Sequence, residues 1–323
     1  MLVLFLNRLD DQWLKRIEEM KSNYPGITFK TRHEDSLDSL LSMADVVVAA
    51  RLSAEEIQKA QKLRLIIVPM AGVNALDWQA IRERGIQVCN CHSNASAVAE
   101  RALALALALL GRVVEYDHDL RYGIWHGYSV HGGEKDYWIS LQKKKVCIVG
   151  FGHIGQHLAR LLQSFSCEIV AVKRTAPMVK DRITSDLDWA IDTSDVIFIT
   201  VPLTKDTRNL FNRERLFRMK NKFLINVSRG EVIDEQALFE ALRDGVLAGA
   251  AIDTWYTYPT TDRECVLPSR FPFNTLRNVV MSPHVGAYCE EALNNLMNET
   301  FEILEKYILS GELMNRVDPE WQY

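Results

Sequence analysis

The stretch Lys145–Gly155, which reads KVCIVGFGHIG, decides the fold class of this 323-residue chain. Its first five residues are apolar enough to predict a β-strand, and three glycines follow with the spacing G-x-G-x-x-G (Gly150, Gly152 and Gly155). A helix is predicted directly after them, over residues 156–165. This order is typical of a dinucleotide site: the glycines permit the tight turn, the approach of backbone to the pyrophosphate, and the packing of helix on strand. The N-terminus of the helix would offer unpaired N–H groups and a positive dipole end to the phosphates.

Two cations follow the next predicted strand, Glu168–Val172. Lys173 stands eighteen residues beyond Gly155, where NAD-dependent enzymes usually carry Asp or Glu, and Arg174 comes next. A carboxylate there would bond the ribose 2′-hydroxyl, whereas cations can pair with a 2′-phosphate. We therefore expect NADP(H) to be favoured over NAD(H). The alternative is that both side chains point to solvent and NAD binds without discrimination.

Strand and helix patterns alternate along the whole chain and predict an α/β protein with two doubly wound parallel sheets. Before the glycine motif, strands are predicted over Leu2–Leu6, Ala44–Ala50, Leu65–Pro69 and Ile86–Asn90. From the motif onward, they are predicted over Lys145–Val149, Glu168–Val172, Val196–Val201, Lys222–Asn226, Ala248–Ile252 and Val279–Met281. Long helical patterns cover Ser96–Tyr122, with Gly111 as its one glycine, and Glu290–Leu309.

The length of the chain predicts about two domains, at roughly 100–200 residues each. We expect a dinucleotide-binding domain over residues 96–288, inserted into a domain made of residues 1–95 and 289–323. The helix from Ser96 would connect the two. The final helical stretch has no sheet partner of its own, so we expect it to pack back on the first domain.

The composition favours a globular protein. Apolar residues make up 48% of the chain and charged residues 25%, which argues against disorder and collagen. With 38 Lys and Arg against 42 Asp and Glu, the net charge is −4, so we expect no nucleic-acid or membrane partner. The longest apolar run, Ala102–Leu110, is too short to cross a bilayer core of about 30 Å.

The cysteines and the N-terminal segment indicate whether a metal site is expected and in which compartment the protein is expected. The six cysteines are scattered and form no CxxC pair, so we expect no metal site. Scattered cysteines fit a reducing cytoplasm. The apolar run Leu2–Leu6 has no basic segment before it, so we expect no signal peptide.

Further short motifs occur in a particular order. They are Ala71-Gly72-Val73-Asn74, Asn94-Ala-Ser-Ala-Val98-Ala99-Glu100, Val201-Pro202-Leu203-Thr204 with Thr207, Asn226-Val-Ser-Arg229-Gly230, Ala251-Ile252-Asp253 and Ser282-Pro283-His284. With the glycine motif, they make the chain resemble the D-isomer-specific 2-hydroxyacid dehydrogenases, from the first strand to about residue 310. The combination is highly specific, although no single motif is. The resemblance implies a flavodoxin-like substrate domain and a Rossmann cofactor domain.

The resemblance also implies roles for individual residues. Arg229 would hold the carboxylate of a 2-oxo acid and polarise its carbonyl, which suits a bidentate guanidinium. His284 would give and retake the proton, since imidazole has an ordinary pKa near 6.5. Asn94 and the backbone N–H groups of Ala71 and Gly72 would bind the substrate with Arg229.

The cofactor-binding residues implied by the resemblance and the glycine motif are Gly150, Gly152, His153, Ile154, Gly155, Lys173, Arg174, Pro202, Thr207, Val227, Arg229, Asp253 and His284. Asp253 would lie near the nicotinamide carboxamide, and its alternative is a carboxylate that caps a helix or turn. His153 would approach a phosphate, and its alternative is simple exposure to solvent.

One position departs from the family pattern. The family normally carries Glu five residues after this Asp, in D-x-x-x-x-E-P, and that Glu pairs with the His and raises its pKa. Here the segment is Asp253-Thr-Trp-Tyr-Thr-Tyr258-Pro259, so Tyr258 occupies the Glu position. A phenol can hydrogen-bond an imidazole but is uncharged at pH 7. We therefore expect a lower pKa for His284 and a more acidic optimum for reduction, unless Glu264, shortly after, takes the place of the missing carboxylate.

The expected activity is NAD(P)H-dependent reduction of a small 2-oxo acid to the D-2-hydroxy acid. Glyoxylate or hydroxypyruvate is favoured and a larger oxo acid is the alternative. A homodimer is expected from the resemblance alone.

Two other functions remain open. Formate dehydrogenases of the same superfamily carry a neutral Gln in D-x-W-x-x-Q-P, which Trp255 and Pro259 match, although this chain is short for that group. A non-catalytic dinucleotide-binding sensor is the second alternative, because fold alone does not prove catalysis. The presence of both Arg229 and His284 argues against a sensor.

Overall fold

A computed structural model describes residues 1–127, 137–179 and 181–323 of the chain. It divides into two compact units: Met1–Asn94 with Glu290–Tyr323, called unit 1, and Ala95–Cys289, called unit 2. Each boundary lies one residue from the boundary expected from the sequence. Every strand pairing in both units is parallel, so the prediction of two parallel-sheet α/β domains is confirmed.

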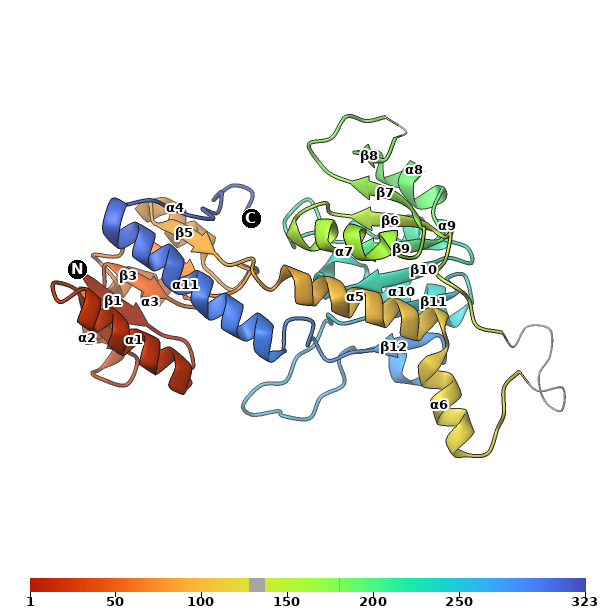
Figure 1. The fold of residues 1–323 in the computed structure, drawn as a ribbon, viewed down its shortest axis with the longest axis horizontal. Coiled ribbons are helices and arrows are strands. Elements are labelled where there is room, and N and C mark those ends of the chain that lie inside the picture. Colours follow the sequence, from red (N-terminus) through yellow and green to blue (C-terminus); the bar gives the residue numbers. More distant parts are fainter. Residues whose placement is uncertain (128–136, 180) are drawn as a thin grey trace. The chain divides into compact units, whose positions relative to one another are not determined.

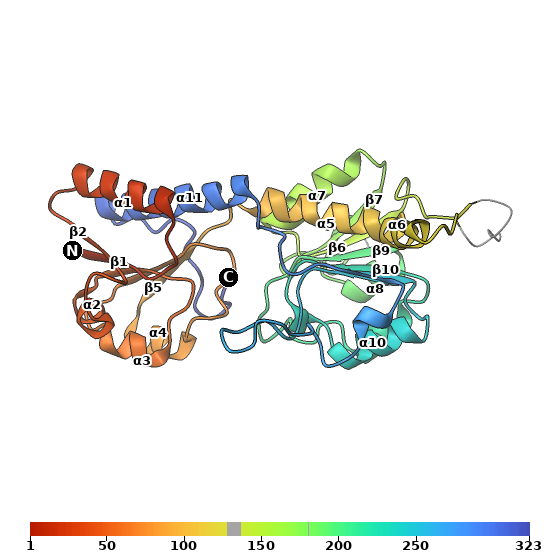
Figure 2. The same cartoon turned by 90° about the horizontal axis from the view of Figure 1, so that it is seen from below.

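Unit 1 is a five-stranded sheet in the order β2-β1-β3-β4-β5, which is the flavodoxin order. Its strands are β1 (Leu2–Phe5), β2 (Thr28–Thr31), β3 (Val46–Val48), β4 (Leu65–Val68) and β5 (Gln87–Asn90). Its helices are α1 (Asp11–Asn23), α2 (Leu37–Met43), α3 (Ala54–Lys59), α4 (Trp78–Arg84) and α11 (Glu290–Ser310). In Figure 2, α1 and α11 cover one face of this sheet, and α2, α3 and α4 cover the other.

The C-terminal helix α11 completes unit 1, as expected from the sequence. Phe301 is fully buried, and its ring centroid lies 5.8 Å from that of Phe5 on β1. Burying a side chain of this size contributes about 1.5–3 kcal/mol. The contact therefore joins the two ends of the chain into one core.

Unit 2 is a seven-stranded sheet in the order β12-β11-β10-β9-β6-β7-β8. This is the dinucleotide-binding order with one additional strand. Its strands are β6 (Lys145–Val149), β7 (Glu168–Val172), β8 (Ile183–Thr184), β9 (Val196–Ile199), β10 (Phe223–Asn226), β11 (Gly249–Ile252) and β12 (Val279–Met281). Its helices are α5 (Ala95–Leu110), α6 (Val113–Arg121), α7 (His153–Gln163), α8 (Leu187–Asp192), α9 (Arg213–Arg218) and α10 (Glu235–Arg243), with short 3-10 turns η1 (Gly230–Val232) and η2 (Phe273–Thr275).

The single long helix expected over Ser96–Tyr122 is wrong, because the chain forms two helices. Arg112 has a left-handed backbone with φ of 51°, and its guanidinium donates from Nε to the Glu115 carboxylate at 2.8 Å. Helix α6 therefore turns away from α5, which packs on the sheet with α7 (Figure 1). Within the ranges that the structure describes, none of the helices combines the length and apolarity that a membrane span requires.

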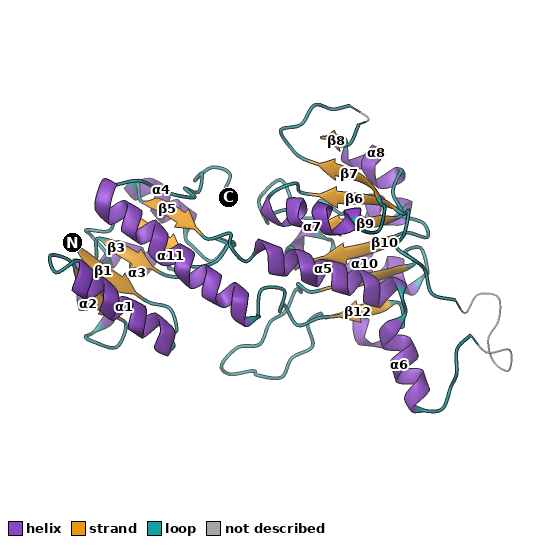
Figure 3. Cartoon of the chain, in the orientation of Figure 1, coloured by secondary structure: helices purple, strands orange, loops and turns teal. Residues whose placement is uncertain are grey.

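The carboxyl ends of the parallel strands in unit 2 meet at one edge of the sheet. The glycine loop follows β6, and the loops that start at Lys173, Val227, Asp253 and Ser282 follow β7, β10, β11 and β12 (Figure 3). Ligands of open α/β sheets bind at this edge. The topology thus brings together residues that lie more than 100 positions apart in the sequence.

Candidate active site

The glycine loop has the geometry of a phosphate-binding turn. Gly150 has φ of 102°, and a Cβ there would lie 2.8 Å from the Val201 nitrogen, so only glycine is accommodated. A Cβ on Gly155 would overlap the Gly150 carbonyl oxygen, so its absence lets α7 pack on β6. Gly152 is different, because the space around its Cβ position is open.

That open space lies at the start of a helix. Gly152 is the N-cap of α7 and, as a glycine, makes no side-chain capping hydrogen bond. The backbone N–H groups at such a helix end donate to phosphate oxygens. The residues present therefore fit the pyrophosphate of a dinucleotide. His153 and Ile154 form the first turn of α7, with His153 exposed and Ile154 half-buried.

The two cations and the loop after β9 lie at the same edge of the sheet. Lys173 and Arg174 directly follow β7 and are exposed, and the Lys173 backbone N–H donates to the Thr184 carbonyl at 2.9 Å. In the loop after β9, the Thr207 hydroxyl donates to the exposed Pro202 carbonyl at 2.6 Å and accepts from the Thr204 N–H at 2.7 Å. These bonds hold the loop in one conformation.

Arg229 carries a positive charge at the end of β10. Its Nη1 donates to the Ser228 carbonyl at 2.7 Å, and Asn226 donates to the Arg229 carbonyl at 3.1 Å. Within the described residues, the Arg229 guanidinium forms no ion pair, and burial lowers its pKa from the ordinary value. Arginine stays protonated even so. A half-buried cation without a counter-ion is complementary to a carboxylate. The neighbouring Val227 is buried.

Asp253 holds the turn that presents His284. The side chain is 2% exposed, and its carboxylate accepts from the Ser282 hydroxyl and from the N–H groups of Val285 at 3.1 Å and Gly286 at 2.9 Å. His284 has φ of 57°, a left-handed conformation that is unusual outside glycine. Three donors on one buried carboxylate stabilise this turn. This is the turn-capping role that the sequence left as the alternative for Asp253.

Tyr258 lies beside His284 without hydrogen-bonding to it. The two ring centroids are 5.4 Å apart at an interplanar angle of 54°, and the Tyr258 hydroxyl accepts from the Trp255 backbone N–H at 3.0 Å. Burial raises the pKa of Tyr258, so the phenol is neutral at pH 7. Glu264 is exposed and is not among the charges that shift the pKa of His284, so it does not take the place of the missing carboxylate.

The environment of His284 lowers its pKa from the ordinary value. Desolvation by the surrounding atoms is the first cause and the positive charge of Arg229 the second, while Asp253 opposes both. The direction is the one expected from the sequence. His284 remains accessible on the surface of unit 2, so the imidazole is open to a ligand.

In unit 1, the loop after β4 offers free backbone donors. The N–H groups of Ala71 and Gly72 make no hydrogen bond within the described part of the chain. Asn90 donates from its side chain to the Ala71 carbonyl at 2.7 Å and so anchors the loop. Asn94, at the end of the unit, is 8% exposed. The open N–H groups can receive an anion.

Sequence reasoning missed the residues that support the neighbouring segment, at and after the end of β5. Glu299 of α11 accepts from the N–H groups of His92 at 2.8 Å and Ser93 at 2.7 Å. Asn315 donates to the Asn90 carbonyl at 3.1 Å and to Glu299 at 2.8 Å. No motif marks Glu299 or Asn315, because their partners are distant in sequence.

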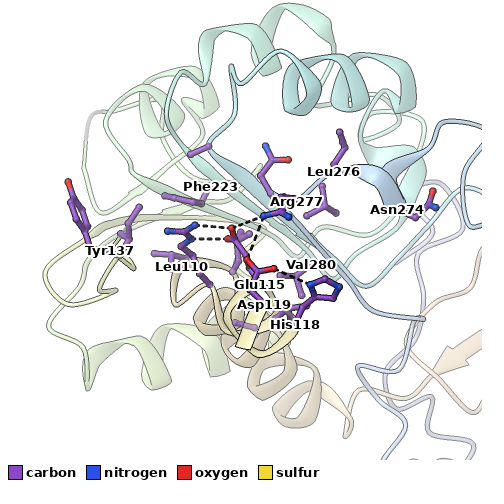
Figure 4. Close-up of a pocket in the computed structure, with 18 residues that line it drawn as sticks. Leu110, Glu115, His118, Asp119, Tyr137, Phe223, Asn274, Leu276, Arg277 and Val280 are labelled. Carbon is purple, nitrogen blue, oxygen red and sulfur yellow. Dashed lines mark hydrogen bonds and ion pairs between the residues drawn. The ribbon is translucent and has the colours of Figure 1, made fainter. Parts of the chain in front are cut away.

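A separate cavity of about 640 Å³ lies at the opposite, amino edge of the unit 2 sheet. It is lined by the starts of β10, β11 and β12, the end of α5, and α6 (Figure 4). In Figure 4, Asp119 faces His118 and Arg277, at 3.1 Å from His118 Nδ1 and 3.6 Å from Arg277 Nη1. None of the residues predicted for the site lines it.

Comparisons with known proteins agree with this geometry. The family model for the NAD-binding domain of D-isomer-specific 2-hydroxyacid dehydrogenases matches residues 103–286. A hydroxypyruvate reductase of Thermotoga maritima is 32% identical over 307 residues, which cover 93% of this chain and 95% of that relative.

Two solved structures are similar along nearly the whole chain. An acyclic imino acid reductase in complex with NADPH and D-Arg has a TM-score of 0.82 at 25% identity, covering 98% of this chain and 100% of that one. An NAD-dependent formate dehydrogenase of Staphylococcus aureus has a TM-score of 0.77 at 28% identity, covering 98% of each chain. The family match over more than half of the chain, the dinucleotide-type sheet and the glycine loop lead to one conclusion. The chain belongs to the D-isomer-specific 2-hydroxyacid dehydrogenases, nicotinamide-dinucleotide enzymes that act on CH–OH groups.

Proposed function

We propose that this protein reduces a small 2-oxo acid, hydroxypyruvate or glyoxylate, to the D-2-hydroxy acid with NADPH. The observation that carries the proposal is Arg229, a half-buried cation that forms no ion pair within the described residues, on the same sheet edge as His284. The similarity to a hydroxypyruvate reductase supports the substrate class. When bound, the dinucleotide supplies the hydride for C2 of the oxo acid.

Residues of this chain would bind the substrate and supply the proton. The Arg229 guanidinium binds the carboxylate of the oxo acid and polarises its carbonyl. In unit 1, the free N–H groups of Ala71 and Gly72, together with Asn94, are complementary to the same kind of anion. His284 delivers a proton from its imidazolium to the developing alkoxide oxygen, which leaves the imidazole neutral. Asp253 keeps the His284 turn in place.

The preference for NADPH rests on Lys173 and Arg174. Both follow β7, where the adenosine ribose binds in this fold, and both are exposed. A 2′-phosphate would receive charge-assisted hydrogen bonds from them, whereas a 2′-hydroxyl gains much less. The remaining cofactor contacts that we propose are with the start of α7, Pro202, Thr207 and Val227.

A 2-imino acid is the second candidate substrate. The observation that favours it is the position of His284 beside the neutral Tyr258, with no ion pair to a carboxylate within the described residues. A protonated imine already carries the proton that a ketone must receive, so its reduction to the amine needs no proton from His284. The similarity to an imino acid reductase with bound NADPH supports this candidate. Formate oxidation needs no acid–base group either, but the similar formate dehydrogenase uses NAD, which Lys173 and Arg174 do not favour.

We also propose a homodimer formed through α6. Val113 and Val114 at the start of α6 are 56% and 55% exposed, and Trp125 beyond its end is 56% exposed. An exposed apolar face of this kind is typical of a protein–protein interface. Sedimentation analysis of Val114→Asp, compared with the wild-type chain, tests the proposal: the wild type should sediment as a dimer and the variant as a monomer.

For location, we propose the cytoplasm. All six cysteines are free thiols, and three of them are buried. Burial raises the pKa of the Cys147 thiol to about 12, so this thiol is unreactive. Free cysteines fit a reducing compartment.

The activity is tested by following NADPH oxidation with glyoxylate, hydroxypyruvate and a bulkier 2-oxo acid, with NADH in parallel. The panel includes pyruvate with excess ammonia, to form an imine, and formate with NADP⁺ or NAD⁺. Turnover of an oxo acid without ammonia, faster with NADPH, is the expected result. Arg229→Met should lower kcat/KM at least a hundredfold. Turnover only with ammonia would favour the imino acid, and full activity of Arg229→Met would contradict the role of this cation.

A further inference from the structure

A chain of hydrogen bonds links helix α5 to the turn of His284. The Arg101 guanidinium on α5 donates from Nη2 to the Ser282 hydroxyl at 2.9 Å. The same hydroxyl donates to the Asp253 carboxylate, which holds the N–H groups of Val285 and Gly286. The Ser282 hydroxyl therefore connects the Arg101 guanidinium to the buried Asp253 carboxylate, and each hydrogen bond polarises the next one.

The same turn is also packed against α5. A Cβ on Gly286 would lie 3.0 Å from the Asp253 carboxylate and 3.7 Å from a methyl group of Val98. The turn is thus confined between the carboxylate on one side and α5 on the other. Arg101 lies one helical turn after Val98, so both residues are on the side of α5 that faces the segment that presents His284.

The charges around Ser282 indicate that Arg101 contributes to the electrostatic environment of Asp253. Asp253 is 2% exposed and forms no ion pair within the described residues, so Arg101 is the cation that reaches it, through one hydroxyl. The Arg101 Nε is buried and finds no hydrogen-bond partner in the described structure. An unsatisfied buried donor is unfavourable for folding, and such violations occur at functional sites.

We propose that Arg101 is a positioning residue: through Ser282 it fixes the Asp253 carboxylate and thereby the left-handed turn that aims His284. Without the guanidinium, the Ser282 hydroxyl is free to rotate and Asp253 loses a polarised donor. The N–H groups of Val285 and Gly286 are then held less firmly. The inference rests on the proposed role of His284 as proton donor, but the turn itself can be measured without turnover.

The test compares Arg101→Met, Arg101→Lys, Ser282→Ala and the double variant Arg101→Met/Ser282→Ala. Arg215→Met is the matched control, because Arg215 is also half-buried in unit 2 but binds Asp188 and the Leu210 carbonyl and has no hydrogen bond to the His284 turn. Hydrogen–deuterium exchange of the backbone amides of Ser282 and of residues 284–287 is measured first, without substrate. Values of kcat and of KM for NADPH and the oxo acid follow, with deuterium isotope effects from NADPH deuterated at the transferred position.

Arg101→Met should raise amide exchange at Val285 and Gly286 at least tenfold, and the Arg215 control should leave it unchanged. It should lower kcat about tenfold, leave the KM for NADPH within twofold, and increase the isotope effect on kcat. Arg101→Lys should restore part of the loss. The double variant should lose no more than the worse single variant, because both changes break one chain.

Unchanged exchange at Val285 and Gly286 in Arg101→Met would overturn the proposal, even if the wild-type protein shows no turnover on the panel. So would a kcat within twofold of wild type, or losses that multiply in the double variant. Increased exchange in a protein that turns over no oxo acid would support the positioning of the turn and contradict the proposed function instead.

Discussion

Replacing Tyr258 by Glu should raise the pKa of His284 and extend reduction to higher pH. The two rings are 5.4 Å apart. A unit negative charge at that separation interacts with an imidazolium by about 3 kcal/mol at an effective dielectric constant of about 20. Because both side chains are partly exposed, solvent screening reduces this to about 1.4 kcal/mol, or about one pKa unit.

The sign of the effect follows from the proton that His284 must deliver. Only the imidazolium can donate, so the rate of reduction falls as pH rises through the His284 pKa. In the wild-type protein that pKa is lowered by desolvation and by Arg229, so the decline should begin below about pH 6.5, the ordinary value. In Tyr258→Glu the decline should begin about one pH unit higher.

The assay is the pH profile of kcat/KM for the oxo acid with saturating NADPH. Tyr258→Gln is the matched control, because it has the size of Glu and no charge, so its profile should follow that of the wild type. The reasoning is refuted if the wild-type limb lies well above pH 7, or if Glu and Gln at this position give the same profile.

Three further predictions concern cofactor binding and the stability of unit 1. Gly152→Ala should fold with an unchanged melting temperature, because a Cβ meets no atom within 4 Å, but should raise the KM for NADPH at least tenfold by obstructing the pyrophosphate; a normal KM would contradict the phosphate site. The double variant Lys173→Ala/Arg174→Ala should raise the KM for NADPH about tenfold and leave the KM for NADH nearly unchanged. Equal effects on the two KM values would disprove discrimination at the 2′-position. Glu299→Ala should destabilise unit 1 by about 2–4 kcal/mol in urea unfolding, since it removes the acceptor for two backbone N–H groups. Glu302→Ala is its control: Glu302 is on the same helix and pairs with Lys306 at 3.2 Å, and its removal should change stability by less than about 1 kcal/mol.

Local patterns explain which elements the sequence predicts well. The expected strands Lys145–Val149, Glu168–Val172 and Val279–Met281 have the observed bounds, because buried parallel strands are short apolar runs. Strand β2 reads TFKT and α2 reads LDSLLSM, and both are too short and too polar to stand out. The break between α5 and α6 was missed as well, because a helix tolerates an isolated glycine and the left-handed Arg112 has no sequence signature.

The two parallel-sheet domains, the glycine loop and the family could therefore be predicted from local patterns, since each depends on residues that are close together in the chain. The hydrogen bonds that support the site could be identified only in the folded structure. Asp253 binds donors 29 to 33 positions away, and Glu299 binds the N–H groups of His92 and Ser93 more than 200 positions away. The sequence shows that Tyr258 stands where the family carries Glu. It does not show that the Tyr258 hydroxyl accepts a hydrogen bond from the Trp255 backbone N–H. Hydrogen bonds are short-ranged and directional, so residues this far apart in the sequence can bond only after folding has brought the strand ends together.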